Sequence, residues 1–270
     1  TTTTTTTTAL NAGRIQPPST AGGITSNLIS QLAVIALKLR LKDQTQVECD
    51  VTMDPVQFLR GNVGPVTVKG RGWRSSLNLT CRAIEATVET CELDFGRILA
   101  KQKIVLTKEA NGKALIAMTG TDFGNFITHP LLRPPRASGK GQLVFLKDGA
   151  FVDAQRNAIR FFGDYEGQKW KFSLQRGTTP GNAVVQAELQ EDAASSATTS
   201  VAETRPEDVM VLTSELSELV ATFFNQMEFE LDGTFLKFDD LMITSKGQEP
   251  SVMLALKIRV VKFPSAGIEF

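Results

Sequence analysis

Three cysteines and one histidine are the side chains in this sequence that could bind a transition metal or serve as nucleophile and base. Cys49, Cys81 and Cys91 form no Cys-x-x-Cys pair, and His129 is the single imidazole. A zinc site needs four ligands, so we expect no metal centre. Cys81 and Cys91 fit either a disulfide in an oxidising compartment or small core residues. His129 precedes a proline without an obvious Ser or Cys nucleophile, which favours a cap or surface position over catalysis.

The acidic residues make no stronger case for acid–base catalysis. Glu48 and Asp50 share the polar face of a predicted strand, and Asp239 and Asp240 adjoin in a predicted turn, so we expect both pairs to be solvated. The glycines at 61–64 and 70–72 lack the spacing of a phosphate-binding loop. Without an acid–base or nucleophile constellation, we expect a protein that is not an enzyme and that uses no cofactor.

The composition is that of an ordinary soluble globular protein. The chain has 270 residues, of which 41% are hydrophobic and 21% are charged. This length supports a sizeable core without staples, and three cysteines are too few for a disulfide scaffold. Basic and acidic residues number 29 each, so the net charge is zero. A general nucleic-acid binder would carry a basic excess, and we expect no nucleic-acid partner.

The charge is nevertheless uneven along the chain. Residues 97–140 hold eight basic and two acidic residues, and residues 188–218 hold eight acidic residues and one basic residue. A basic middle region could meet anionic lipid headgroups, or its lysines could be ordinary solvated strand edges. The membrane-docking hypothesis assigns headgroup contacts and apolar insertion to Arg97, Lys101, Lys103, Leu131, Leu132, Arg133 and Arg136.

The first part of the chain combines a core-free segment with a strongly apolar one. Residues 1–21 begin with eight threonines and contain little that could form a core, so we expect a disordered lead-in. Its acid-free, hydroxyl-rich start resembles the remnant of an organelle transit segment, and the alternatives are an artificial extension or partial processing. Residues 26–42 are expected to form one helix, apolar over most of its circumference. Its longest apolar run, 32–37, is too short to cross a bilayer.

The remaining pattern predicts many strands and a second apolar helix. Alternation marks strands near 47–53, 66–68, 77–88, 143–146, 158–162, 169–175, 183–189 and 252–261, with a short helix after Thr121. Strand segments at 104–106 and 114–118 flank a hairpin turn signal at 110–112, and those at 229–231 and 235–243 flank a second one at 232–233. Residues 191–206 are expected to be a flexible acidic loop, and 214–227 a helix capped by Thr213. Strands that follow one another without helices favour antiparallel pairing. We therefore predict an α+β fold in which a long curled, mainly antiparallel sheet wraps around two long apolar helices, as one domain over 22–270.

The two helices supply the large side chains of the predicted lipid site. We expect their apolar stripes to line one continuous cavity for an acyl chain, although the same pattern fits a well-packed core. The predicted lining residues are Leu28, Leu32, Ile35, Leu39, Leu216, Val220, Phe223 and Phe224.

Several blocks of the chain resemble the LmeA-like phospholipid-binding family. They are residues 23–28, 61–72, 93–99, 105–108, 122–132, 231–234 and 262–268, and the block at 93–132 is most similar to the cyanobacterial and plastid branch. The resemblance implies a tubular lipid-binding fold and no catalytic residues. It also implies phospholipid binding, which in the actinobacterial members supports lipid-linked glycan assembly. The acidic loop departs from the compact members.

These observations lead to one principal functional expectation and two rivals. We expect non-enzymatic binding or transfer of a phospholipid or glycolipid in an internal apolar cavity, at a plastid (chloroplast) membrane, in the stroma or on the thylakoid. A structural subunit or assembly factor of a membrane protein complex would use the same apolar surface. A lipid-modifying enzyme is disfavoured because acid–base constellations are missing.

Overall fold

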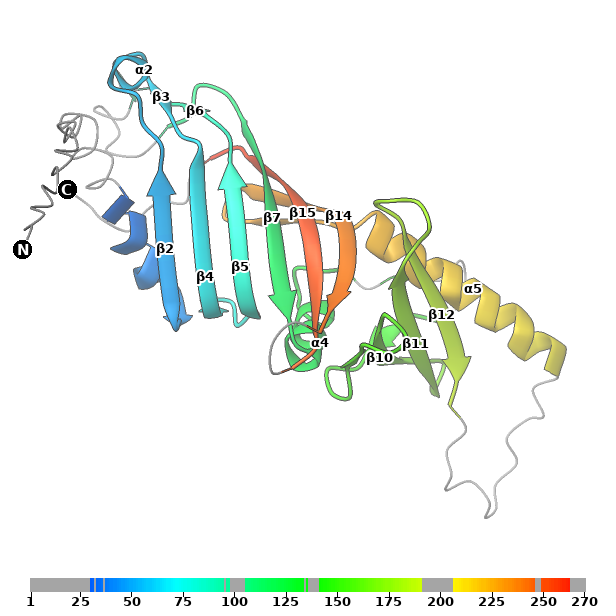
Figure 1. Ribbon diagram of the computed structural model, residues 1–270. Helices are drawn as coiled ribbons and strands as arrows, with labels where there is room; N and C mark the ends of the chain where they lie inside the picture. Colours follow the sequence, from blue (N-terminus) through cyan, green and yellow to red (C-terminus); the bar gives the residue numbers. More distant parts are fainter. Residues whose placement is uncertain are drawn as a thin grey trace, which may run out of the picture.

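The computed structural model describes residues 30–31, 33–35, 37–94, 96–97, 105–133, 135, 141–190, 206–245 and 249–262. Two antiparallel sheets account for most of this part of the chain, and a pair of two-residue strands is added to them (Figure 1). The expected lead-in at 1–21 lies outside the described residues, and so does the acidic segment up to residue 205.

The larger sheet has eight strands and curls into a half-barrel. Its main path runs β1-β4-β5-β7-β15-β14-β13, and β2 also pairs with β4. The edges are therefore β1 and β2 on one side and β13 on the other. The strands are β1 Leu41–Asp43, β2 Gln46–Val51, β4 Val66–Ser75, β5 Thr80–Val88, β7 Ala110–Met118, β13 Glu228–Leu231, β14 Thr234–Thr244 and β15 Ser251–Val260.

Three cross-strand rows on one face of this sheet contain only apolar residues and glycine. The register aligns Cys49, Val68, Ala86, Ala114, Leu256 and Phe238 in one row. A second row holds Val47, Gly70, Ile84, Ile116, Leu254 and Leu241, and a third holds Val51, Val66, Val88, Gly112, Ile258 and Leu236. Because side chains alternate across a strand, the intervening residues lie on the opposite face. We call the apolar face the inner face.

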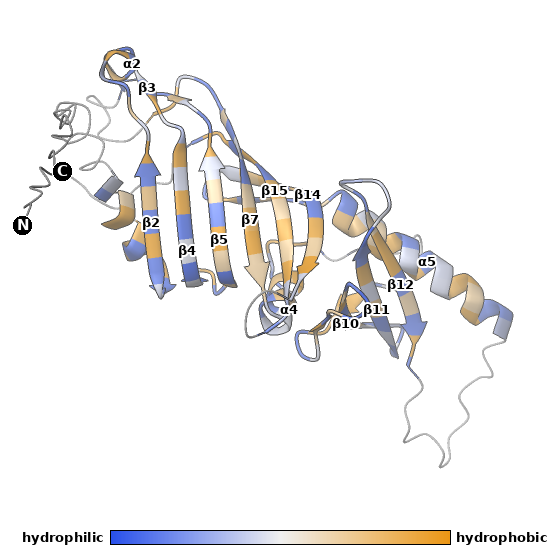
Figure 2. Cartoon of the chain, in the orientation of Figure 1, coloured by the Kyte–Doolittle hydropathy of each residue, from blue (hydrophilic) through white to orange (hydrophobic). Residues whose placement is uncertain are grey.

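The opposite, outer face of the larger sheet is mostly polar. Lys69 and Glu85 form a cross-strand ion pair at 3.1 Å between Nζ and Oε1, and the hydroxyls of Thr67 and Thr87 are 3.2 Å apart. The alternation is visible as bands of opposite hydropathy along β2 and β4 (Figure 2). A sheet with one apolar and one polar face must bury the first against a second layer.

The smaller sheet shares a core with part of that inner face. Its order is β12-β11-β10-β8, and β9 also pairs with β10. Phe161, Trp170, Phe172 and Leu174 on its inner face are fully buried and join one core cluster with residues of the larger sheet. The strands are β8 Val144–Phe145, β9 Phe151–Asp153, β10 Ala158–Tyr165, β11 Gln168–Arg176 and β12 Ala183–Leu189.

Short elements complete the layer and the sheet ends. Helix α4, Gly120–Ile127, buries Phe123 in the core and begins at Thr119, whose hydroxyl forms a capping box with Asp122. The predicted cap, Thr121, was therefore two residues too late. Close to one end of the larger sheet, helix α2, Pro55–Leu59, leads into strand β3, Asn62–Val63, which pairs with β6, Cys91–Glu92.

Helix α5, Pro206–Asn225, lies along the free edge of β12. The Asn225 amide donates to the Ala183 carbonyl at 3.0 Å and accepts from the Ala183 N–H at 2.7 Å. The Ser217 hydroxyl accepts from the Ala187 N–H at 2.9 Å. The side chains of the helix therefore occupy backbone groups that an edge strand would otherwise leave unpaired. The predicted start at residue 214 was wrong, because Thr213 lies inside the helix and donates to the Val209 carbonyl.

The prediction of a sheet wrapped around two long apolar helices is also wrong. Among the described residues α5 is the single sizeable helix. The other predicted helix is helical at 30–31, 33–35 and 37–40 and gives way to strand β1 at Leu41. Its apolar side chains do not form the centre of the molecule, since Ile35 is 51% exposed and Leu39 is 71% exposed. The buried part of the inner face, on β14 and β15, packs instead in a core shared with α4, α5 and the smaller sheet.

Candidate functional site

The three apolar rows are buried on β14 and β15 and mostly half-buried on β4, β5 and β7. Leu254 and Leu256 on β15 and Leu241 on β14 are each 1% exposed. On β4, β5 and β7 most of the corresponding residues are half-buried, although Ala114 on β7 is 5% exposed. Val66, Val68 and Ile84 are not part of the main core cluster. We call this middle region the apolar trough; it consists of Val66, Val68, Ile84, Ala86, Val88 and Ile116.

Trp73 forms one border of the apolar trough. A Cβ atom on Gly70 would lie 2.0 Å from Cε2 of Trp73, so the indole lies over the glycine on the inner face. The indole Nε1 donates to the Gln46 carbonyl of β2 at 2.8 Å. Glycine at position 70 is therefore required by the close approach of the ring, and the ring is held beside the trough by a hydrogen bond.

A short helix connects the two edges of the larger sheet. We call residues 30–31, 33–35 and 37–40 the strap helix; it is drawn in blue beside β2 in Figure 1. At its start the Ser30 hydroxyl accepts from the Val51 N–H on the β2 edge at 3.1 Å. At its end the Arg40 guanidinium meets the Asp232 carboxylate, in the turn between β13 and β14, at 2.7 Å. The strap helix thus reaches from one edge of the half-barrel to the other.

A groove of about 460 Å³ lies between the strap helix and β2. Its lining is largely apolar and consists of Ser30, Gln31, Val34, Ile35, Val47, Glu48 and Cys49. Val47 and Cys49 belong to two of the three apolar rows, so the groove adjoins the inner face at its β2 edge. Its volume falls in the range of sites for small ligands.

The predicted lipid-lining residues do not form one continuous interior. Ile35 lies beside β2, whereas α5 packs along β12 at the other end of the molecule (Figure 1). Leu216, Val220 and Phe224 are fully buried in the core. The predicted residues Leu28 and Leu32 lie outside the described residues, and Leu39 is exposed on the strap helix.

The aromatic side chains at the end of α5 pack tightly against their neighbours. The ring centroid of Phe223 is 5.5 Å from that of Phe145, and the ring of Phe224 is 6.0 Å from the rings of Phe123 and Phe161. Such spacings are those of packed aromatic clusters. In this structure α5 therefore supplies core rather than a cavity wall.

The structure describes only some of the predicted membrane-contact residues. Arg97 is exposed and its guanidinium pairs with Asp94 at 3.3 Å. Leu132 is 6% exposed and belongs to the core, so only Leu131, half-buried, and Arg133, exposed, are left for a membrane contact at this loop. Lys101, Lys103 and Arg136 lie outside the described residues.

Neither the cysteines nor His129 belongs to a metal-binding group among the described residues. All three cysteines are free, and burial raises the pKa of each thiol, most strongly for Cys81, where the nearby Asp122 carboxylate adds to the effect. His129 bonds the Leu77 carbonyl through Nε2 at 2.9 Å and accepts the Leu131 N–H at Nδ1. Both ring nitrogens are thus used structurally.

Within the part of the chain that the structure describes, no three His, Cys, Asp or Glu side chains gather as a metal site would require. None of its helices has both the length and the apolar character needed to span a membrane.

No family model, curated protein or solved structure matches this chain. The resemblance to the LmeA-like family therefore stays a prediction.

The apolar trough was missed in the sequence, although its signal was present. Val66 and Val68 alternate with polar residues, and the alternation continues through Ile84, Ala86 and Val88 on the next strand. Alternation identifies an apolar face without identifying what covers it. The difference between a buried and a half-buried part of one face appears only when the second layer is placed.

Proposed function

We propose that this protein binds a lipid without catalysing a reaction, and that an acyl chain lies in the apolar trough. The observation that carries the proposal is the continuity of the three apolar rows across β5 and β4, from Ala86 and Val88, which are only partly buried against the core, to residues outside the core cluster. Those residues are Val66, Val68 and Ile84. Exposed apolar surface costs about 25 cal/mol per Å², and contiguous apolar surface on a folded protein marks a place where something binds. A half-barrel with an apolar inner face suits a long, flexible hydrocarbon.

The strap helix supplies a membrane-facing element for this function. Ile35 and Leu39 are one turn apart, so they share a helix face, and both are exposed. Lys38 beside them is exposed as well. Apolar residues flanked by a basic one suit the interface of an anionic bilayer. The ligand class is a phospholipid or glycolipid, and a plastid membrane is its source by the resemblance given above.

Native mass spectrometry after gentle purification tests lipid binding, with one variant in the trough and one on the opposite face. Ile84→Glu places a charge on the inner face of β5, where it would have to lie against a hydrocarbon chain. Ala83→Glu places the same charge on the outer face of the same strand, opposite Arg71. We expect co-purified lipid with the wild-type protein and with Ala83→Glu, and at least about a tenfold loss with Ile84→Glu.

The proposal is contradicted if folded wild-type protein carries no lipid and captures none from vesicles. It is also contradicted if Ile84→Glu, shown by circular dichroism to be folded, retains as much lipid as Ala83→Glu.

The rival function, a subunit or assembly factor of a membrane complex, is favoured by one other surface. Met210 and Val211 near the start of α5 are 74% and 58% exposed, and such residues often mark a protein interface. Lipid-free protein that remains in a large membrane complex during the same purification would support this rival.

A further inference from the structure

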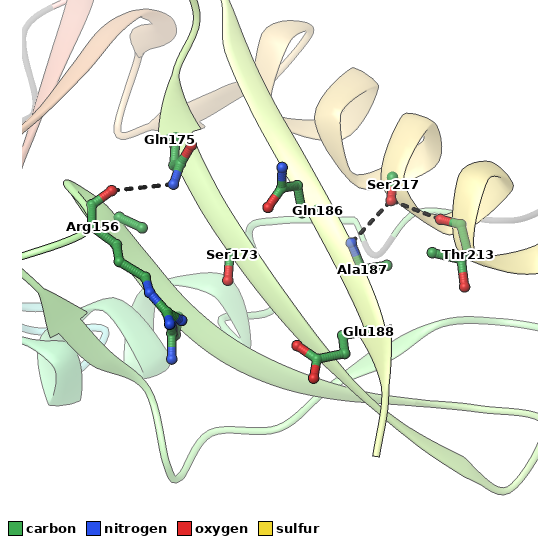
Figure 3. Close-up of a pocket in the computed structure, with 10 residues that line it drawn as sticks. Arg156, Ser173, Gln175, Gln186, Ala187, Glu188, Thr213 and Ser217 are labelled. Carbon is green, nitrogen blue, oxygen red and sulfur yellow. Dashed lines mark hydrogen bonds between the residues drawn. The ribbon is translucent and has the colours of Figure 1, made fainter. Parts of the chain in front are cut away.

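A second hollow lies on the outer face of the smaller sheet, apart from the apolar trough. It has a volume of about 480 Å³ and is bounded by β10, β11, β12 and α5 (Figure 3). We call it the outer polar pocket. Its lining consists of Arg156, Ala158, Arg160, Ser173, Gln175, Gln186, Ala187, Glu188, Thr213 and Ser217.

The register explains why this part of the sheet is hollow. Arg160, Ser173 and Gln186 form one cross-strand row on the outer face, and the small Ser173 stands in the middle of it. Ala158, also small, lies in the next row opposite Gln175. Two central positions with small side chains leave space between the longer ones around them, and α5 closes the side beyond β12.

The pocket contains more hydrogen-bond donors than the described residues satisfy. Arg160 pairs with Asp153 at 3.1 Å, but its buried Nε atom has no hydrogen-bond partner. The exposed Arg156 guanidinium and Gln186 amide and the half-buried Ser173 hydroxyl make no hydrogen bond to another side chain of the described residues, so a ligand could bind them. A buried donor without a partner in a native structure calls for water or a ligand.

The charges around the pocket leave one cation in excess. The Arg160 charge is balanced by Asp153, and Glu188 pairs with Lys171 at 2.6 Å. Arg156 therefore remains without a counter-charge in the part of the chain that the structure describes. A surplus of donors and of positive charge selects a ligand rich in acceptors and negatively charged, and guanidinium groups match tetrahedral oxyanions especially well.

We propose that the outer polar pocket binds a phosphate group, held by Arg156, Arg160, Ser173 and Gln186. The phosphate belongs either to a soluble phosphate ester or to a lipid headgroup. This site lies on the smaller sheet and the apolar trough lies on the larger one. Phosphate binding can therefore be tested independently of lipid binding in the trough.

Isothermal titration calorimetry of the full chain with inorganic phosphate and glycerol 3-phosphate tests the soluble source. Co-sedimentation with vesicles of phosphatidic acid, against vesicles of phosphatidylcholine, tests the headgroup. Arg156→Gln removes the unbalanced cation and, since Arg156 is exposed, leaves the fold intact. Lys169→Gln is the matched control, because it removes one positive charge from the outer face of the same sheet outside the pocket lining.

We expect saturable binding of one phosphate per chain in one of the two arms, weakened about tenfold or more by Arg156→Gln and little by Lys169→Gln. Calorimetric binding identifies a soluble ester, and retention only on phosphatidic acid vesicles identifies a headgroup. The proposal is overturned if neither arm shows binding, or if the two variants lose binding equally, which would indicate unspecific attraction of anions.

Discussion

At the scale of single residues, burial controls the reactivity of the cysteines. Burial in the first place, and the Asp122 charge in the second, raise the pKa of Cys81 from 9.0 to about 12. Each pKa unit is a factor of ten in the thiolate fraction, so at pH 8 the folded protein holds roughly a thousandth of the Cys81 thiolate of the unfolded chain. We predict correspondingly slow alkylation by iodoacetamide, measured by peptide mass spectrometry. Equal rates in native buffer and in urea would contradict this.

The same shift predicts a dependence of stability on pH. The folded pKa lies above the unfolded one, so the stabilisation that Cys81 contributes is complete below about pH 9. It is lost as the pH rises from about 9 toward 12, because the unfolded thiol ionises first. We expect the free energy of unfolding in urea to fall over this window. A smaller fall in a folded Cys81→Ala variant would assign the effect to this thiol, and an unchanged fall would refute the assignment.

At the scale of elements, α5 protects the edge of the smaller sheet through two polar side chains. Asn225→Leu would leave the N–H and the carbonyl of Ala183 without their present partners. A buried unsatisfied group costs about 1–3 kcal/mol, so we predict a loss of about 2 kcal/mol or more in urea unfolding, and faster hydrogen exchange at the Ala183 amide. Gln226→Leu, at the exposed neighbouring position, is the control. Equal stability of the two variants would show that the edge does not depend on Asn225.

Local sequence patterns predicted the type of many helices and strands better than they predicted how these elements pack together. The alternation in β15 and the apolar stripe of α5 follow from period-2 and period-3.6 spacing, and the structure places Leu216, Val220 and Phe224 on the buried side of that helix. The hairpin turn predicted at 110–112 was wrong, because these residues belong to strand β7. The turn at 232–233 also matches its sequence signal, since both residues have positive φ. The start of α5 was misplaced because Thr213 is a good cap residue in isolation.

The spacing of apolar residues in the sequence did not predict where the strap helix lies. Residues 26–42 are as apolar as a core helix, yet the described part of that segment lies across the sheet edges, with Ile35 exposed. The main core instead contains Phe161, Trp170 and Phe172 of the smaller sheet, and none of the described strap-helix residues belongs to it. Which segment packs in the core depends on the whole chain and cannot be derived from one window of sequence.

At the scale of the whole molecule, each of the two sheets carries one of the two proposed binding sites. The larger sheet offers an apolar trough closed at one side by the core and bridged between its edges by the strap helix. The smaller sheet offers a polar pocket with an unbalanced arginine on its outer face. The two tryptophans of the chain are divided in the same way, with Trp73 beside the trough and Trp170 fully buried in the smaller sheet.

This division allows the location of a bound acyl chain to be measured directly. Bromine atoms on an acyl chain quench tryptophan fluorescence only at short range, so a phospholipid with brominated acyl chains should quench wild-type protein through Trp73. In Trp73→Phe, which retains only Trp170, we predict that the brominated lipid binds but quenches no more than its unbrominated counterpart. Quenching that persists in Trp73→Phe, or bound brominated lipid that leaves wild-type fluorescence unchanged, would contradict an acyl chain in the apolar trough.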